Sequence, residues 1–185
     1  MYTAFYFDCI ELPLHTAYQK PRMKGSPVSA TQNMVYFELL EKGKRFCAYR
    51  DRCKAEVAQK LLPLGATGQL LEKVINALIE EGFIDEKRFS EAFARGKFEY
   101  NQWGRLRIKQ ELILKKIPEE LIDPALNQID QNQYQLLLEK IATKKLQSLK
   151  GRDEFTARGK TAGFCINKGF EPDLVWKTVN KINFK

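Results

Sequence analysis

The chain has 185 residues and is strongly basic, with 31 Lys and Arg against 23 Asp and Glu and a net charge of +8. This length suits one domain of ordinary size or a short array of repeats. The charge favours a polyanionic or acidic partner, such as nucleic acid, an acidic protein groove or a membrane surface. No stretch reaches the ~18 uninterrupted apolar residues of a spanning helix, so we expect a cytoplasmic protein with no membrane partner.

The first 31 residues show no sustained hydrophobic period. Their later part, from His15 to Thr31, mixes prolines, glycine, serine and basic residues. This composition is typical of a flexible tail. We therefore predict an N-terminal appendage over residues 1–31 and a folded part from residue 32 onward.

From residue 32 onward, apolar residues recur at the spacing of amphipathic helices, and no alternating stretch competes for a strand. The predicted helices span about residues 33–49, 52–64, 70–81, 86–100, 105–116, 118–129, 131–149, 153–168 and 172–182. Gly43 weakens the first of them. The sequence therefore predicts an all-α protein.

The stretch from Glu81 to Pro118 contains a helix–turn–helix unit whose boundaries are marked by particular residues. Gly82 follows an apolar-periodic run and can take the left-handed conformation that ends a helix. Asp85 suits the N-cap of the next helix, because its carboxylate can accept from the free amides of the first turn. The apolar face expected on that helix consists of Phe89, Ala92, Phe93 and Tyr100.

Similar residues recur along the chain at offsets of 51 and 53 positions. The offset of 51 relates Val57, Leu61 and Gly65 to Ile108, Leu112 and Lys116. The offset of 53 relates Leu121, Ala125 and Ile129 to Leu174, Thr178 and Ile182. The phrase KGF at 168–170 likewise matches KKI at 115–117. Such self-similarity predicts three three-helix units, roughly 32–84, 85–129 and 130–184, stacked in an elongated, curved array. The alternative is one globular all-α domain with coincidental spacing.

The basic excess grows toward the C-terminus, where residues 130–185 carry eleven Lys and Arg against six Asp and Glu, a net +5. Such a run can be a solvated face, a set of phosphate contacts or a surface for an acidic protein. In the middle unit, Arg105, Arg107 and Lys109 stand where a helix–turn–helix protein places its groove-entering residues. Few base-reading side chains accompany them, which favours backbone or protein contacts. Trp103 either stacks on a base or packs between helices.

Catalytic patterns are absent from the sequence. Its single histidine, His15, lies in the predicted tail, and it has no glycine-rich phosphate loop. Cys9, Cys47, Cys53 and Cys165 lie at irregular spacings that match no zinc site, so we expect free thiols that act as small buried apolar residues. We therefore expect a protein that is not an enzyme and that binds no cofactor and no metal.

Four phrases stand out along the sequence: CKAEVAQKLLPLG at 53–65, EEGFIDEKRFSEAF at 80–93, the W-G-R-x-R-I-x-x-E-L pattern at 103–112 and GFCINKGF at 163–170. Together they resemble the RecX family, the regulatory proteins of the RecA recombinase. The resemblance covers about residues 33–182. Two features depart from the family pattern: the tail through Thr31 has no counterpart, and Lys116 stands where a glycine is usual.

The resemblance implies an all-helical array of three three-helix repeats that binds RecA, restrains its filament on DNA and suppresses ATP hydrolysis and strand exchange. We predict that the chain is a monomer that contacts the RecA filament, and single- or double-stranded DNA weakly, through basic side chains. These candidates are Arg88, Arg95, Arg105, Arg107, Lys109, Lys144, Lys145 and Arg152. The alternatives are a stand-alone, non-sequence-specific nucleic-acid-binding module and a helical scaffold for an acidic partner.

Overall fold

The computed structural model describes the backbone of residues 27–183 and the side chains of residues 31–183. Within this range the chain forms nine α-helices, one 3-10 turn and no strand, as the sequence predicted. In chain order they are α1 (Pro27–Ala48), α2 (Lys54–Leu61), the 3-10 turn η1 (Leu62–Leu64), α3 (Gly68–Glu80), α4 (Glu86–Glu99), α5 (Arg105–Leu114), α6 (Glu119–Asn127), α7 (Gln131–Gln147), α8 (Glu154–Asn167) and α9 (Pro172–Lys181). The predicted tail before Pro27, with Cys9 and His15, lies outside the described residues.

The helix α1 differs from the prediction at its start and in the role of its glycine. It begins at Pro27, four residues before the predicted end of the tail at residue 31. Proline suits a first helical position, where its missing N–H costs no hydrogen bond. Gly43 lies inside the helix and is buried, and a Cβ there would stand 2.7 Å from Leu78 Cδ1. This glycine therefore lets α1 pack closely against α3.

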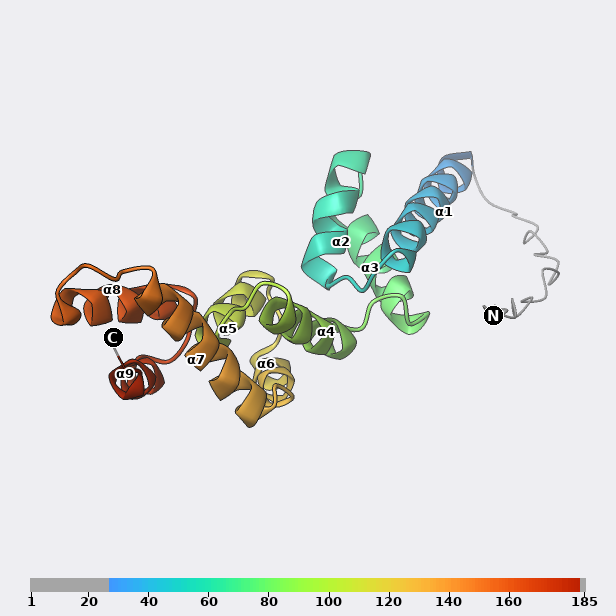
Figure 1. The fold of residues 1–185 in the computed structure, drawn as a ribbon. Helices are drawn as coiled ribbons and strands as arrows, with labels where there is room; N and C mark the ends of the chain where they lie inside the picture. The colour runs from blue at the N-terminus through green and yellow to red at the C-terminus, as the bar shows by residue number, and fades with distance from the viewer. Residues whose placement is uncertain (1–26, 184–185) are drawn as a thin grey trace, which may run out of the picture.

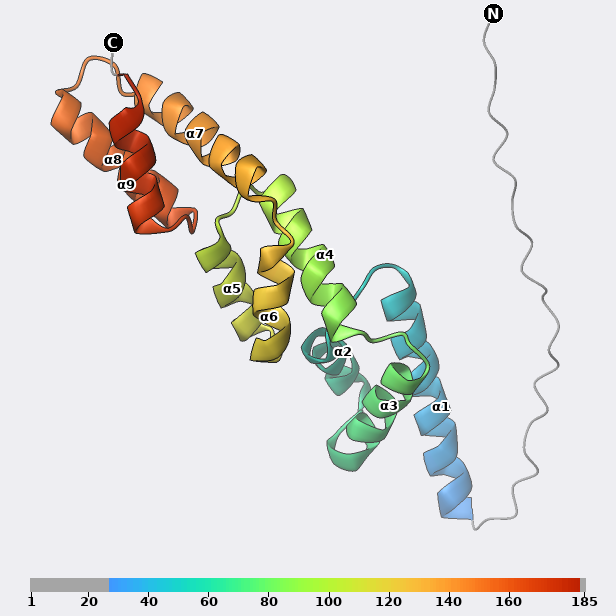
Figure 2. The ribbon, with the colours of Figure 1, turned by 90° about the horizontal axis from the view of Figure 1, so that it is seen from below.

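The helices pack as three consecutive triplets: α1 with α2 and α3, α4 with α5 and α6, and α7 with α8 and α9. Figures 1 and 2 show the triplets following one another along an elongated, bent body. We propose the boundaries that the sequence predicted, after residues 84 and 129. The first unit is then 27–84, the second 85–129 and the third 130–183.

Each unit turns the same corner between its second and third helices. Gly65, Lys116 and Gly169 all have positive φ there, at 90°, 59° and 90°. The next residue in each case donates its N–H to the carbonyl five positions back, over 3.3 Å, 3.1 Å and 3.3 Å. This pattern is the Schellman helix end, which normally calls for glycine. The second unit therefore makes the same turn as the other two, although it has Lys116 and not a glycine at this position.

Two separate hydrophobic cores fill the body. One lies within the first unit and is built from α1, α2, α3, Ala66 and Ile84. The other runs continuously through the second and third units and receives from the first unit only the buried Cys53 and the partly buried Ala55. Cys47, Cys53 and Cys165 are free and buried, which confirms the prediction for the three cysteines in the described range.

The second and third units share buried groups and backbone hydrogen bonds. The ring of Tyr134, fully buried on α7, lies between Phe98 of the second unit and Phe170 of the third, with ring centroids 5.9 Å and 5.1 Å away. At the start of α5, Gly104 N–H donates to the carbonyl of Lys168 over 2.8 Å, and Leu106 N–H donates to that of Gly169 over 3.0 Å. These units therefore form one packed body.

The helix α4 buries a different face from the predicted one. Phe89 is buried as expected, but the rest of the buried face consists of Glu86, Ser90, Ala94 and Phe98, and Tyr100 is 85% exposed. Residues four apart line the side of α4 that packs on α6 and the shared core. The predicted face followed the large apolar side chains, which include Tyr100, whereas the buried face includes the polar Glu86 and Ser90.

Candidate functional site

The eight basic residues predicted to bind a partner lie in several different environments. Arg88 and Lys109 pair with carboxylates: Arg88 Nε lies 2.6 Å from Asp51 Oδ1, and Lys109 Nζ lies 3.0 Å from Asp123 Oδ1. The hydrogen bond and charge of Asp123 raise the pKa of Lys109. These two cations are therefore partly neutralised within the fold.

Arg105 occupies a structural position between α5 and the turn before α7. Its guanidinium donates to Gln131 Oε1 over 2.8 Å and to the carbonyl of Ile129 over 2.9 Å. The same group lies 4.2 Å from the centroid of the Tyr134 ring. Its main role in the structure is to hold the second unit against the third.

Three of the predicted residues, Arg95, Lys144 and Arg152, are exposed, and their side chains make no hydrogen bond or ion pair with any described residue. They come from the middle of α4, the end of α7 and the loop before α8. Their charges are available to a partner. In this they differ from Arg88, Arg105 and Lys109, whose side chains have partners within the fold.

Arg107 and Lys145 belong to a larger arrangement that we call the basic–aromatic band. Its six members are Lys97, Trp103, Arg107, Lys145, Phe164 and Lys168. Lys97 Nζ lies 4.7 Å from the centroid of the Trp103 ring, and the Arg107 guanidinium lies 4.1 Å from it. Lys145 Nζ lies 5.2 Å from the centroid of the Phe164 ring, and Lys168 Nζ lies 5.8 Å from it. Both rings are partly exposed, so cations and ring faces are presented together.

The two halves of the band meet where the second and third units join. Lys168 Nζ donates to the carbonyl of Asn101, in the turn that leads to Trp103, over 3.4 Å. Gly169, next to Lys168, packs directly on Arg107, because any Cβ at this glycine would collide with the Arg107 side chain and backbone. The band therefore crosses the junction without a break.

The four cations of the band have no carboxylate partner among the described residues. Sequence analysis identified Arg107 and Lys145 but missed Lys97, Phe164 and Lys168. A usable signal was present, because Phe93 and Lys97, Trp103 and Arg107, and Phe164 and Lys168 are each four residues apart. Within a helix that spacing places two side chains together, as it does for Phe93 and Lys97 on α4. Trp103 lies two residues before α5, and Lys168 directly follows α8. Trp103 packs on the core with one part and lies beside cations with another.

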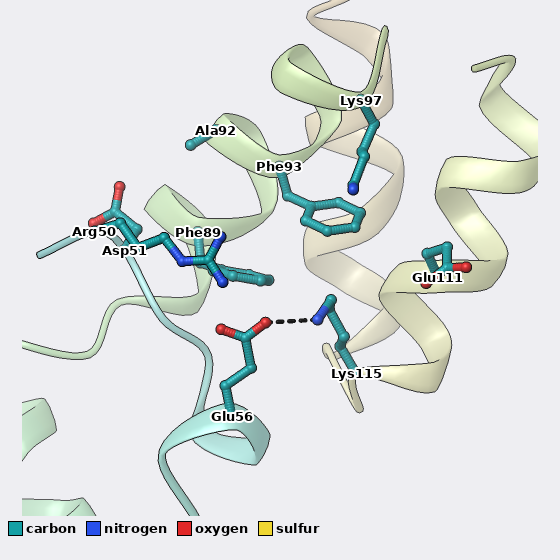
Figure 3. A pocket seen from close by; sticks show the side chains of 9 residues that line it. All are labelled: Arg50, Asp51, Glu56, Phe89, Ala92, Phe93, Lys97, Glu111 and Lys115. Carbon is teal, nitrogen blue, oxygen red and sulfur yellow. Dashed lines mark hydrogen bonds and ion pairs between the residues drawn. The ribbon is translucent and has the colours of Figure 1, made fainter. Parts of the chain in front are cut away.

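A cleft lies beside the band, where the first unit meets the second (Figure 3). It has a volume of about 390 Å³, and its walls are Arg50, Asp51, Glu56, Phe89, Ala92, Phe93, Lys97, Glu111 and Lys115. The rings of Phe89 and Phe93 stack with centroids 5.7 Å apart. Lys97 lies 5.2 Å from the Phe93 ring and so joins the cleft to the band. The cleft holds equal numbers of carboxylates and cations, so it is not a basic site by itself.

Glu56 is the most constrained carboxylate of this cleft. Its Oε1 lies 2.6 Å from Lys115 Nζ, and its Oε2 lies 3.3 Å from Arg52 Nη1. Burial alone would raise the pKa of Glu56, but the hydrogen bonds and charges of Lys115 and Arg52 outweigh burial and hold that pKa below its usual value. Glu56 is therefore held in its ionised form by cations from two different units.

Among residues 31–183, no group of three or more His, Cys, Asp and Glu side chains is placed to hold a metal ion. No helix in the same range is both long and apolar enough to span a membrane.

In comparisons with known proteins, two of the three units match domains of one protein family. The second three-helix domain of RecX matches residues 85–126, and the third three-helix domain of RecX matches residues 133–179. The regulatory protein RecX of Pelodictyon phaeoclathratiforme is 33% identical over 122 residues, which cover 66% of this chain and 74% of that protein. That of Clostridium tetani is 33% identical over 140 residues, which cover 75% of this chain but 64% of the relative.

Solved structures share the fold. A crystal structure of a regulatory protein RecX superposes with a TM-score of 0.77 at 21% identity, covering 86% of this chain and 81% of that chain. RecX from Lactobacillus salivarius gives a TM-score of 0.73 at 20% identity, covering 80% of this chain and 97% of that chain. The similar sequences and the shared array of helices lead to one conclusion: the chain belongs to the RecX family of regulatory proteins.

Proposed function

We propose that this chain binds RecA and its nucleoprotein filament, and that it restrains ATP hydrolysis and strand exchange by RecA in DNA repair and recombination. Membership of the RecX family supports this role. The observation that carries it is the basic–aromatic band, whose four cations lack carboxylate partners in the described part of the chain. A nucleoprotein filament presents phosphates and protein carboxylates to such cations.

The shape of the body suits a filament as the partner. The band spans the second and third units, and the exposed Arg95, Lys144 and Arg152 add charge on the same two units. An elongated body with binding residues in more than one unit can touch several protomers at once, and modest contacts then add through multivalency. Arg88, Arg105 and Lys109 contribute less in this proposal, because intramolecular partners occupy them.

The second candidate function is a stand-alone nucleic-acid-binding module. The exposed parts of Trp103 and Phe164 favour it, because ring faces between cations are the usual platform for unpaired bases. Such a module would bind bare DNA with a steep salt dependence. Removing four phosphate contacts would reduce the slope of log K against log salt by about 3 for a single strand.

The experiment is a titration of DNA-dependent ATP hydrolysis by RecA from the same organism, at fixed salt. We expect inhibition at protein levels well below those needed to coat the DNA. A variant with Lys97→Gln, Arg107→Gln, Lys145→Gln and Lys168→Gln should need at least about tenfold more protein, which corresponds to a loss of roughly 1.4 kcal/mol in binding.

The matched control removes the same charge elsewhere, with Lys42→Gln, Lys73→Gln, Lys140→Gln and Lys177→Gln, all at exposed positions. It should inhibit like the unmodified protein. Equal potency of the band variant and the unmodified protein would refute the role of the band. Inhibition that begins only when the DNA is saturated would favour the nucleic-acid-binding module.

A further inference from the structure

The first unit is attached to the second mainly by ion pairs. Three of them cross the junction: Arg88 Nε to Asp51 Oδ1 at 2.6 Å, Lys115 Nζ to Glu56 Oε1 at 2.6 Å, and Lys54 Nζ to Glu86 Oε2 at 3.0 Å. We call these three pairs the clasp. Figure 3 shows Glu56 on α2 facing Lys115 at the end of α5 across the cleft. The clasp therefore connects α2 and the loop before it to α4 and α5.

Apolar contact across the same junction is small. Of the core that fills the second and third units, only Cys53 and Ala55 belong to the first unit. The cleft, open between the two units, takes the place of a packed interface. Burial of apolar area thus contributes little to the relative position of the two units.

The covalent connection between the two units is short and is fixed at both ends. On one side, Phe83 and Ile84 both donate their N–H to the carbonyl of Leu78, and Ile84 is buried in the first core. On the other side, Asp85 caps α4 by accepting from Arg88 N–H over 2.9 Å. Rotation between the units is therefore confined to the link between Ile84 and Asp85.

The other junction is built differently. Between the second and third units, Tyr134 is fully buried between two rings, and two backbone hydrogen bonds fix the start of α5. The hydroxyl of Tyr134 also accepts from Arg105 N–H over 3.0 Å and donates to Glu171 over 2.7 Å. Salt weakens such a junction much less than it weakens exposed ion pairs, because its rings and hydrogen bonds are largely buried.

We propose that the first unit is a hinged arm that pivots at the link between Ile84 and Asp85 and that the clasp holds in its closed position. Ion pairs that are partly open to solvent weaken as salt shortens the range of electrostatic attraction. Rising ionic strength therefore releases the arm, while the second and third units keep their arrangement.

The test measures distances in the full chain between spin labels, with Cys9→Ser so that only introduced thiols are labelled and the buried cysteines stay unmodified. One pair of labels, at Asn76→Cys on α3 and Gln135→Cys on α7, reports on the arm. A second pair, at Gln110→Cys on α5 and Asn180→Cys on α9, reports on the body of the second and third units. All four positions are exposed and uncharged.

Raising the salt concentration from ~0.05 M to ~0.5 M takes the electrostatic screening length from above 10 Å to well below it. Over this range, the distance between the labels at 76 and 135 should shift, and the distribution of that arm distance should broaden. The body distance should stay the same. Glu56→Gln should broaden the arm distribution already at low salt. Its matched control is Glu111→Gln, which removes the same charge from the same cleft but has no ion pair there, and it should leave the distribution narrow.

An arm distribution that stays narrow at every salt concentration, in both the unmodified chain and Glu56→Gln, would overturn the proposal, because the three units would then be one rigid body. Equal broadening of both label pairs would overturn it as well, since salt would then loosen the whole fold. Equal effects of Glu56→Gln and Glu111→Gln would show that general charge, and not the clasp, holds the arm.

Discussion

Lys116 adopts a left-handed backbone conformation, with φ 59°, at the corner that glycine occupies in the other two units. For a residue with a Cβ this conformation costs roughly 1–2 kcal/mol. The corner persists because the surrounding residues require it: Ile117 is buried just after it and donates its N–H to the carbonyl of Leu112. A single residue thus adopts a conformation that its own side chain disfavours.

Lys116→Gly should therefore stabilise the second unit by about 0.5–1 kcal/mol. This figure is the backbone strain that is relieved, minus the larger conformational entropy that glycine loses on folding. The measurement is the urea midpoint of unfolding. Lys116→Ala is the control, because it removes the same charge and keeps the Cβ. Equal stabilisation by alanine would mean that charge repulsion, and not backbone strain, is relieved.

At the scale of elements, the helices and their ends follow from local sequence, and their close contacts do not. Asp85 caps α4 and Gly82 ends the preceding segment with φ 74°, both as predicted, because capping depends on residues only a few positions apart. Gly43 and Tyr134 gave no such signal. Their roles depend on neighbours 35 and 36 positions away, Leu78 and Phe170, so the sequence alone did not reveal where two elements touch.

The residues of the candidate site also fall into two groups, those that the local sequence indicates and those that only the tertiary structure identifies. Arg107 and Lys145 could be singled out as basic residues on helices. Trp103 lies only four positions from Arg107, so that contact is local. The contact of Lys145 with Phe164 depends instead on how α7 and α8 pack. Arg105 looked equivalent to Arg107 in the sequence, but only the structure shows that its guanidinium is occupied by Gln131 and Ile129. Tertiary contacts decide which cations remain available to a partner.

Gly104 at the start of α5 provides a test at this scale. A Cβ at this position would collide with the backbone of Gly169 and Phe170, so Gly104→Ala should destabilise the chain by about 1–3 kcal/mol. Gly96→Ala is the matched control, because Gly96 lies within α4 with nothing within 4 Å of its added Cβ. It should be neutral or stabilising by up to about 1 kcal/mol. Chemical denaturation measures both, and an equal effect of the two changes would contradict the close approach of α5 to the third unit.

The described part of the chain contains two hydrophobic cores that have no residue in common. Separate cores joined by a mainly polar junction unfold as separate cooperative units. The division falls between the first unit and the rest, and not between every pair of repeats, because the second and third units are sealed by Tyr134 and its neighbours.

Calorimetry should therefore show two unfolding transitions. Leu78→Ala, in the core of the first unit, should lower the midpoint of one transition only, and Leu138→Ala, in the shared core, should lower the other. Both leucines are fully buried, and each change should cost about 2–5 kcal/mol. One transition lowered by both variants would mean that the three units form a single cooperative structure.

The two cores also set an order of events during synthesis of the chain. The last residue of the first core is Ile84, so this core can form while the remainder of the chain is still being made. The shared core includes Val175 and Val179 and stays incomplete until the final helix has left the ribosome. The second unit therefore spends the rest of translation with its apolar face uncovered, beside a neighbour that has already folded.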